Sequence, residues 1–366
     1  MRVIVTGGGT GGHIYPALAI ADKFKEMDPE TEILYVGNEE GIEKDVVPKT
    51  GYPMELVDAR WLDKSSPWQL IKTGARVAKG VLESNRVMSK FKSVFVIGTA
   101  GCVCFPGIIA GKRFGARTFL HEQNAFPGLA NRTLEKYVNK VFLGFSDAAK
   151  YFKDPSKMVE AGNPVRKSFF SLNKTEARKK LGFPQDDFIV FSFGGSLGAE
   201  KINEVAFELM QVVNGHEKMR MVFGTGKWYY DSIIKKAEER GIVLKDNILI
   251  KDYIDDMENY LAASDLIISR AGALSVAETT VCGRACILIP SPNVTGNHQY
   301  YNAKAVADRG GAILIEEKDL TSEGLIKEVM HLKNNPEIAE KMGRAARACA
   351  PMKALDIIYD EIQAAL

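Results

Sequence analysis

The first residues that suggest chemistry are a cluster of glycines near the N-terminus. Five glycines lie within residues 7–12, directly after the β-branched run 3–5, which is typical of a buried strand. A glycine loop between a strand and a helix exposes backbone N–H groups, which suit a phosphate or another anionic oxygen. The loop lacks the Lys-Ser/Thr ending of a P-loop and only loosely matches the dinucleotide fingerprint. His13 follows it, and an imidazole at the mouth of a parallel sheet can exchange a proton near neutral pH.

A second glycine loop occupies residues 194–199 and also follows an apolar run. Ser196 places a hydroxyl in this loop, where it and the loop amides can bind a diphosphate. Asn203, about two turns into the following helix, is expected near the same site. Because two such loops occur in one chain, we favour ligand binding over a merely tight turn.

A carboxylate lies in a third candidate segment, residues 267–278, which begins near a strand end. Gly272 and Ala273 permit close approach of the backbone, and Ser275 is expected to cap the following helix. Glu278, one turn inside, can accept hydrogen bonds from both hydroxyls of a ribose, as acidic residues do in nucleotide sites. The alternative is a glutamate stabilised only by the helix dipole.

The elements that must position these residues alternate between strands and helices, which predicts an α/β protein with parallel, doubly wound sheets. The pattern breaks at residues 162–166, and a polar stretch runs on to Pro184. We therefore expect two Rossmann-like domains, residues 1–161 and 162–350, facing each other across a cleft, with a C-terminal helix at about 351–366 packing back on the first. Strands are expected at residues 32–37, 54–57, 93–97, 118–121, 140–143, 188–193, 219–223, 247–250, 266–268 and 286–289, and helices at 17–24, 67–91, 105–114, 201–213 and 336–366, with a break near Pro351.

The composition is that of an ordinary globular protein. The 366 residues carry 48 basic and 46 acidic side chains, so the net charge of +2 identifies no partner by itself. The N-terminus lacks the basic region of a signal peptide, and no apolar run reaches the ~18 residues of a membrane-spanning helix. We expect the protein to stay in the cytosol. The cysteines stand in apolar or alanine-rich surroundings and are predicted to be buried free thiols rather than a zinc site: Cys102, Cys104, Cys282, Cys286 and Cys349.

Six motifs follow one another along both halves of the chain: GGGTGGH (7–13), HEQN (121–124), GNPVR (162–166), GGSLGA (194–199), RAGALSVAE (270–278) and HQYYNA (298–303). Together they resemble the bacterial MurG family, the peptidoglycan N-acetylglucosaminyltransferases of the GT-B fold. The resemblance implies inverting transfer of N-acetylglucosamine from UDP-GlcNAc to the 4-hydroxyl of the MurNAc-pentapeptide of undecaprenyl-pyrophosphoryl lipid I, which gives lipid II. It further implies an anionic membrane surface and other cell-wall synthesis proteins as partners, but no cofactor and no nucleic acid.

The same resemblance assigns roles to residues. Domain 1–161 would bind the acceptor and the cytoplasmic face of the membrane, and domain 162–350 would bind UDP-GlcNAc. His13 is the candidate base, and Glu122 is the alternative base or the group that orients it. The chain departs from the family at His298, where the family has the first of two glutamines. The UDP-GlcNAc-binding residues implied are Thr10, Gly11, Gly12, Asn124, Arg166, Ser196, Ile254, Ala273, Leu274, Ser275, Glu278 and Gln299.

Two other functions stay open at this point. A UDP-GlcNAc 2-epimerase would use the same fold. A dinucleotide-binding dehydrogenase or regulator would need an acidic residue at the end of the second strand, where residues 36–38 supply none, although Glu39 is near.

No Asp-x-Asp motif suggests a metal, and Asp255-Asp256 is typical of a helix start. Departure of UDP is then expected to rely on backbone amides, helix N-termini and Arg166.

A basic segment favours membrane contact. Between Lys64 and Arg117, ten basic side chains stand against one acidic side chain, Glu83. Interleaved aromatic and aliphatic groups suit insertion into an anionic interface. The alternative is a helix that packs its apolar side on the sheet and leaves its charges in water. The basic residues are Lys64, Lys72, Arg76, Lys79, Arg86, Lys90, Lys92, Lys112, Arg113 and Arg117, and the apolar ones are Trp68, Leu70, Ile71, Val81, Leu82 and Phe114.

Overall fold

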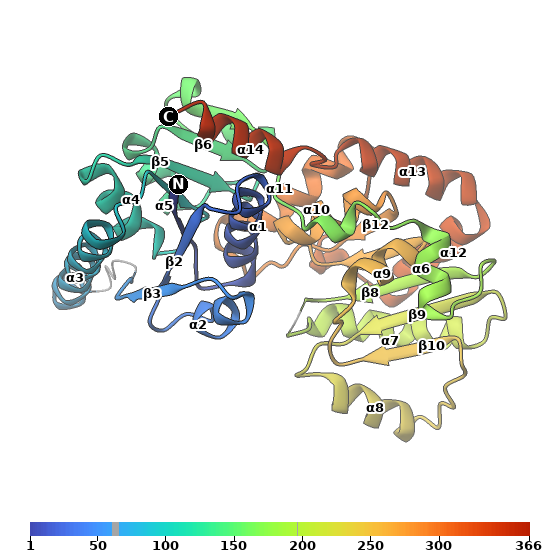
Figure 1. Ribbon diagram of the computed structural model, residues 1–366. Coiled ribbons are helices and arrows are strands. Elements are labelled where there is room, and N and C mark those ends of the chain that lie inside the picture. The colour runs from blue at the N-terminus through green and yellow to red at the C-terminus, as the bar shows by residue number, and fades with distance from the viewer. Residues whose placement is uncertain (61–65, 196) are drawn as a thin grey trace. The chain divides into compact units, whose positions relative to one another are not determined.

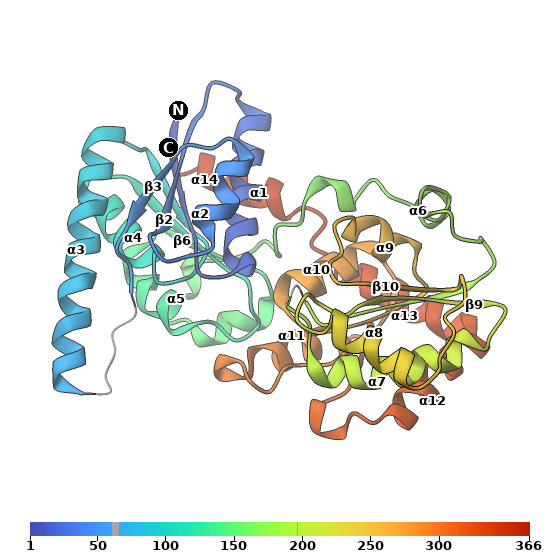
Figure 2. The same ribbon diagram turned by 90° about the horizontal axis from the view of Figure 1, so that it is seen from below.

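The computed structural model describes residues 1–60, 66–195 and 197–366, which divide into two compact units (Figures 1 and 2). Unit 1 comprises Met1–Val165 and Lys353–Leu366, and unit 2 comprises Arg166–Met352. Among the described residues, no helix is long and apolar enough to cross a membrane.

Unit 1 is built on a parallel sheet. Its described strands are seven and run in the order β3-β2-β1-β4-β5-β6-β7, every pair parallel. The order reverses between β1 and β4, so the loops after these two strands leave the carboxyl edge of the sheet side by side. The strands are β1 (Arg2–Thr6), β2 (Glu32–Asn38), β3 (Met54–Val57), β4 (Phe95–Gly98), β5 (Arg117–Glu122), β6 (Lys140–Leu143) and β7 (Met158–Glu160), and the helices are α1 (Gly11–Met27), α2 (Glu43–Val46), α3 (Pro67–Phe91), α4 (Cys104–Arg113), α5 (Leu129–Leu134) and α14 (Ala354–Gln363).

The core of unit 1 lies on both faces of this sheet. On one face, α14 lies beside α1, and the rings of Phe24 and Tyr359 meet edge to face with centroids 5.1 Å apart. Lys23 and Asp356 form an ion pair of 2.6 Å between the same two helices. On the other face α3 stands beside the sheet as a long helix, which Figure 2 shows clearly. Its start is well specified, since the Ser66 side chain accepts from Gln69 N and Pro67 is the first helical residue.

Unit 2 repeats the plan. Its described strands are six, all parallel, in the order β10-β9-β8-β11-β12-β13, and the order reverses between β8 and β11. Ligands bind at such switch points in open α/β sheets. The strands are β8 (Phe188–Phe193), β9 (Met219–Gly224), β10 (Ile248–Lys251), β11 (Leu266–Ser269), β12 (Ala285–Leu288) and β13 (Ile313–Leu314), and the helices are α6 (Lys174–Leu181), α7 (Glu200–Asn214), α8 (Tyr230–Glu239), α9 (Met257–Ala263), α10 (Ala273–Cys282), α11 (His298–Ala307), α12 (Ser322–Asn334) and α13 (Pro336–Ala348).

The prediction of two doubly wound parallel sheets is confirmed, with local differences. Helix α1 begins at Gly11 rather than Ala17, because the Gly-Gly pair adopts helical geometry in its first turn. Helix α6 lies within the stretch expected to be an irregular junction. The helix was not predicted because its sequence is mostly charged, although Asn173 caps its start by accepting from Glu176 N. The short edge strands β7 and β13 were not predicted, since two or three residues carry no periodicity.

The cysteines are only partly as expected. All five are free, but Cys104 and Cys286 alone are buried, and the other three are half-buried. Burial raises the pKa of the Cys104 thiol to about 12, so this group stays protonated and unreactive at neutral pH.

Helix α6 is fastened to the sheet of unit 2 by a buried guanidinium. The Arg178 side chain is 1% exposed and donates to Asp265 Oδ2 at 2.6 Å and to Ala263 O at 2.9 Å. The same Asp265 oxygen accepts from Ile189 N at 2.7 Å, which links the helix to the first residues of β8. Removing one partner of such a buried ion pair lowers the stability of the protein strongly, because it leaves the other charge buried and unpaired.

We predict that Arg178→Met lowers the free energy of unfolding by about 3 kcal/mol, the lower end for breaking a buried ion pair. The lower end applies because Lys174 still pairs with Asp265. Urea unfolding followed by circular dichroism measures this change. Lys179→Met, at the exposed neighbouring position, is the matched control and should change stability little. Equal stability of the two variants would contradict the anchor.

Candidate active site

In unit 1 the loops after β1 and β4 touch at the strand-order switch. A Cβ added at Gly101 would lie 2.5 Å from Gly8 O, so only glycine fits there, and Gly101 has a φ of +93°. Gly8 N lies 3.4 Å from Ala100 O across the same contact. We call residues 7–10 the first glycine loop. Its position is fixed by this close approach of two backbones.

The anion-binding groups of this loop differ from those expected. Gly8 N–H and Gly9 N–H already donate within the protein, to Ala100 O and to the Glu43 carboxylate. The groups left to a ligand are at the start of α1, where Thr10 is the N-cap residue and forms no side-chain cap. Thr10, Gly11 and Gly12 thus lie together at the N-terminus of a 17-residue helix, which favours negative charge.

His13 lies in the first turn of α1 rather than at the end of a loop. Its Nδ1 is 2.9 Å from Gly8 O, and because a carbonyl can only accept, Nδ1 carries the proton. In the neutral ring Nε2 is then the unprotonated nitrogen. Burial lowers the pKa of His13, against smaller opposing effects of the Gly8 carbonyl and the Glu43 charge, so the ring is neutral near pH 7.

Glu122, the second catalytic candidate, ends β5 and is 1% exposed. Its carboxylate accepts from Asn124 N at 3.0 Å, Gly128 N at 3.1 Å and Asn131 Nδ2 at 2.9 Å. It also accepts from Asn124 Nδ2 at 3.2 Å. Burial raises the pKa of Glu122, while these donors lower it. The geometry suits a group that shapes the turn carrying Asn124 better than one that collects a proton.

Two segments of unit 1 are joined by His121, Gln123 and Asn163, which belong to the HEQN and GNPVR motifs. His121 Nε2 lies 2.9 Å from Gly162 O, and Asn163 Nδ2 donates to Gln123 O at 3.0 Å. His121 is fully buried, and burial lowers its pKa to about 4. These side chains hold the loop after β5 against the segment after β7, and their role is structural.

In unit 2 the second glycine loop follows β8 and is also held by close backbone contact. A Cβ at Gly198 would clash with Thr225 O, and Gly195 and Gly198 have φ values of +100° and +87°. The proposed diphosphate ligand Ser196 lies outside the described residues. Asn203 is buried, and its Nδ2 donates to Thr225 O at 2.8 Å in the loop after β9. Its Oδ1 has no hydrogen-bond partner among the described residues, and the residue lines a larger cavity beside the second glycine loop, so its expected place near this site is retained.

A small cavity lies beside this loop. Its volume is 170 Å³, and its lining includes Phe193, Gly195, Ile254 and Ser275. Pockets for drug-sized ligands span about 300–1,000 Å³, so this smaller one suits a single ring. Ile254 and Ser275, assigned to the nucleotide from resemblance alone, are thus brought together.

The N-terminus of α10 borders the same cavity. Gly272 is its N-cap residue, so the expectation that Ser275 caps the helix is wrong, and Ser275 instead stands in the first turn. Ala273 and Leu274 are the first two helical residues, whose N–H groups have no intrahelical partner. An uncapped helix start next to a ring-sized cavity suits a phosphate.

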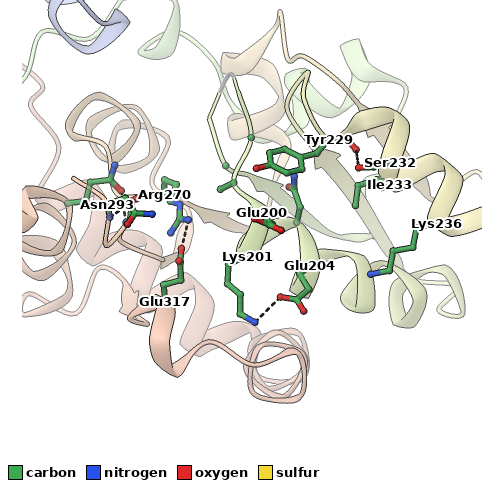
Figure 3. Close-up of a pocket in the computed structure, with 16 residues that line it drawn as sticks. Glu200, Lys201, Glu204, Tyr229, Ser232, Ile233, Lys236, Arg270, Asn293 and Glu317 are labelled. Carbon is green, nitrogen blue, oxygen red and sulfur yellow. Dashed lines mark hydrogen bonds and ion pairs between the residues drawn. The ribbon is translucent and has the colours of Figure 1, made fainter. Parts of the chain in front are cut away.

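A larger cavity of 880 Å³ also borders the second glycine loop (Figure 3). Gln299 lines it, and Gln299 Oε1 accepts from Ser291 N at 2.9 Å, which leaves the NH₂ group to donate to a ligand. Arg270 and Glu317 form an ion pair on the cavity wall, which Figure 3 shows. Arg270 belongs to the RAGALSVAE motif but was not chosen from sequence. Arg270 could have been identified from its position directly after strand β11, at the edge of the sheet where ligands bind.

Glu278 and Arg166 approach each other near α9. Glu278 is three residues after Ser275 on α10 and therefore lies on the same helix face. Burial raises the pKa of Glu278 to about 7, with the Arg166 charge lowering it and the Glu258 charge raising it. Arg166 lies 3.6 Å from Glu258 and over the ring of Phe169. A carboxyl with a raised pKa, three residues along α10 from the cavity-lining Ser275, is a candidate ligand group.

In the part of the chain that is described, no three His, Cys, Asp or Glu side chains converge as metal ligands would. The candidate ligand groups of unit 1 are the start of α1, a histidine and a neutral amide, and those of unit 2 are the start of α10, a neutral amide and a single carboxyl group. Two doubly wound parallel sheets, each with candidate ligand-binding groups near its strand-order switch, are the architecture of a GT-B protein.

Comparison with known proteins agrees with this class. The model of the glycosyltransferase family 28 N-terminal domain matches residues 3–143, and that of the C-terminal domain matches residues 189–358. The chain belongs to glycosyltransferase family 28.

Individual relatives are consistent with this assignment. The chain is 41% identical over 366 residues, all of this chain and 99% of the relative, to a UDP-N-acetylglucosamine--N-acetylmuramyl-(pentapeptide) pyrophosphoryl-undecaprenol N-acetylglucosamine transferase of Alkaliphilus oremlandii. The crystal structure of Acinetobacter baumannii MurG superposes with a TM-score of 0.77 at 24% identity, covering 99% of both chains. A UDP-GlcNAc 2-epimerase of Neisseria meningitidis gives a TM-score of 0.71 at 14% identity over the whole of both chains, a likeness of fold alone.

We predict that uridine binds more tightly as pH rises from 6 to 8. The Glu278 pKa of about 7 means that the carboxyl loses its proton in this interval, and only the carboxylate accepts from both ribose hydroxyls. The affinity should rise about tenfold as the ionised fraction rises. Calorimetric titration with uridine avoids the titrating phosphates of UDP.

Glu278→Gln should abolish this pH dependence and remove the preference for uridine over 2′-deoxyuridine. If the variant keeps the wild-type pH profile, the ribose lies elsewhere.

Proposed function

We propose that the chain transfers N-acetylglucosamine from UDP-GlcNAc to the 4-hydroxyl of N-acetylmuramyl pentapeptide on undecaprenyl pyrophosphate. This converts lipid I to lipid II. The observation that carries the proposal is the 41% identity, over the full length of this chain, to a transferase named for this donor and acceptor. The described residues of each unit include groups suited to a part of this transfer, which supports the proposal.

Unit 2 is assigned the donor nucleotide. The 170 Å³ cavity beside Ile254 receives the uracil, and Glu278, one turn along α10, receives the ribose. The diphosphate is assigned to the second glycine loop, Ser196 included, and to the uncapped start of α10. Arg166 adds positive charge near Glu278, and Gln299 donates from the larger cavity to the sugar.

Unit 1 is assigned the acceptor and the base. In one displacement with inversion, the acceptor oxygen bonds to C1 of the sugar while the C1–O bond to the β-phosphate breaks. The bonding electron pair leaves with UDP, and the acceptor proton passes to Nε2 of His13. The start of α1 at Thr10–Gly12 stabilises negative charge nearby, and Asn124 offers a neutral amide to sugar hydroxyls.

The 2-epimerase alternative is not favoured, because its structural likeness extends to the fold only. A single assay separates the two activities. With radiolabelled UDP-GlcNAc, the proposal expects label in a lipid I analogue and release of UDP only when that acceptor is present. Formation of UDP-N-acetylmannosamine from UDP-GlcNAc alone, without transfer, would contradict it.

His13→Ala should lower kcat by about 100-fold or more, the usual scale for a positioned base, and leave UDP affinity unchanged. Steady-state transfer kinetics and a UDP titration check the two parts. His331→Ala, an exposed histidine of α12, is the control and should retain wild-type turnover. Full turnover of the His13 variant would exclude His13 as the base.

We further propose that unit 1 meets the membrane where the lipid-linked acceptor is held. Trp68 and Leu129 are 72% and 68% exposed, which is unusual for large apolar side chains. Both stand near helix N-termini, of α3 and α5, and thus toward the carboxyl edge of the parallel sheet. The first glycine loop lies at that edge. Lys64 lies outside the described residues, as do the side chains of Leu70 and Ile71.

The basic residues of the segment differ in their partners and in their place on the fold. Arg76 and Lys79 both pair with Asp58, an acid from outside the segment, at 2.9 and 3.5 Å. Arg76 also lies 3.7 Å from Glu40, and Lys79 lies 3.4 Å from Glu83. Helix α3 is 25 residues long, about 37 Å, so Lys72 and Lys90 stand near opposite ends. Lys112, like Lys90, lies at a helix C-terminus and so toward the opposite edge of the sheet.

We predict that Trp68→Asp with Leu129→Asp lowers binding to anionic liposomes at least about tenfold, since burying each side chain is worth about 1.5–3 kcal/mol. Co-sedimentation measures binding, and transfer to a short-chain soluble acceptor should be spared. Lys90→Glu with Lys112→Glu, at the opposite edge, is the matched control. If the control loses binding and the apolar variant keeps it, the membrane face lies at the other edge.

A further inference from the structure

A carboxylate that the mechanism does not yet use lies behind the first glycine loop. Glu43, the first residue of α2, is 0% exposed. A Cβ added at Gly8, Gly37 or Gly41 would lie under 3.0 Å from its side chain. Three glycines from three separate positions thus leave open the space that this side chain fills. Such a cage places the carboxylate and excludes water from it.

The two oxygens of Glu43 accept from backbone amides. Oε1 accepts from Asn38 N at 2.9 Å, and Oε2 accepts from Gly9 N at 3.0 Å. The Gly9 N–H belongs to the same peptide group as Gly8 C=O. That carbonyl is the one 2.9 Å from His13 Nδ1. The carboxylate and the imidazole are therefore joined by a single peptide group, with one hydrogen bond at each end.

This arrangement has a chemical consequence. A carboxylate that accepts from the N–H of a peptide group polarises that peptide group. The C=O of the same group then accepts a stronger hydrogen bond, because hydrogen bonds in series reinforce one another. The carbonyl then holds the proton on Nδ1 and leaves Nε2 as the acceptor. When Nε2 takes a proton, the negative charge of Glu43 stabilises the imidazolium. An aspartate bonded directly to a catalytic histidine has the same two effects.

We propose that Glu43 is a positioning residue for His13, acting through the Gly8–Gly9 peptide group to fix the tautomer in which Nε2 accepts the proton. The expected effect on kcat rests on the proposed function, in which His13 is the base. The expected effect on the His13 tautomer does not. The competing explanation is that Glu43 only fixes the turn after β2 through Asn38 N.

The test compares Glu43→Gln with the wild type. Glutamine keeps the shape and removes the charge, and it can offer an acceptor to only one of the two amides. Nitrogen-15 NMR of labelled histidine distinguishes Nδ1–H from Nε2–H, and the His13 signal is identified by its loss in His13→Asn. Glu39→Gln, an exposed glutamate of the same turn, is the matched control.

In the wild type and in Glu39→Gln, His13 should be the Nδ1–H tautomer. In Glu43→Gln it should become a mixture, and kcat should fall about 10- to 100-fold, as for loss of a partner that orients a ligating histidine, while KM for UDP-GlcNAc stays unchanged. A folded Glu43→Gln protein with the wild-type tautomer and kcat would overturn the proposal.

Two further outcomes are distinguishable. If Glu43→Gln is unfolded by circular dichroism, Glu43→Asp takes its place. The shorter carboxylate loses Gly9 N–H, so a similar fall in kcat supports the proposal and wild-type kcat overturns it. If the tautomer changes while kcat does not, the link to His13 stands and the assignment of His13 as base fails.

Discussion

The close approach of backbones at the glycine loops after β1 and β8 is the constraint on which the rest of the structure depends. In unit 1 the loop after β1 touches the loop after β4 through Gly8 and Gly101. In unit 2 the loop after β8 instead touches the loop after β9, where a Cβ at Gly226 would clash with Gly198. Two loops that look alike in sequence are thus anchored on different neighbours. The first loop contacts the loop after the central strand β4 and leads into the start of α1. The second loop contacts the loop after β9, so the N-terminus of α10 stays accessible to a ligand.

Three glutamates illustrate how the protein separates structure from ligand binding. Glu43 and Glu122 are buried and accept from backbone amides, so their charges are compensated inside the fold. For Glu278 burial is the largest effect on the pKa, and only the Arg166 charge opposes it. Because few protein groups stabilise the charge of this carboxylate, hydrogen-bond donors on a ligand would stabilise it further. By this argument the ribose assignment to Glu278 is stronger than a resemblance of motifs alone.

Much of the fold could be predicted from sequence, because parallel strands and their helices carry strong apolar periodicity. Helix α3 was predicted with its observed bounds, since Ser66 and Pro67 mark its start. Helix α6 was missed because its stabilisation comes from Arg178, a charged residue that is buried only through long-range partners.

The site was predictable in its residue types but not in its pairings. No sequence pattern shows that Gly9 N–H is taken by Glu43, 34 residues away, or that Asp58 pairs with Arg76. These contacts depend on which strands are neighbours, and a window along the chain does not contain that information. Motif residues such as His121 and Asn163 stand beside functional ones yet serve the fold, which sequence alone could not separate.

The central claim is a division of labour in which unit 2 holds the nucleotide and unit 1 holds the base. A crystal structure of the intact chain with UDP alone tests it most directly, because without the sugar the nucleotide reports only its own site. The account predicts the uracil in the 170 Å³ cavity beside Ile254, with the ribose on Glu278. UDP with its uracil bound to unit 1, and that cavity empty, would contradict it.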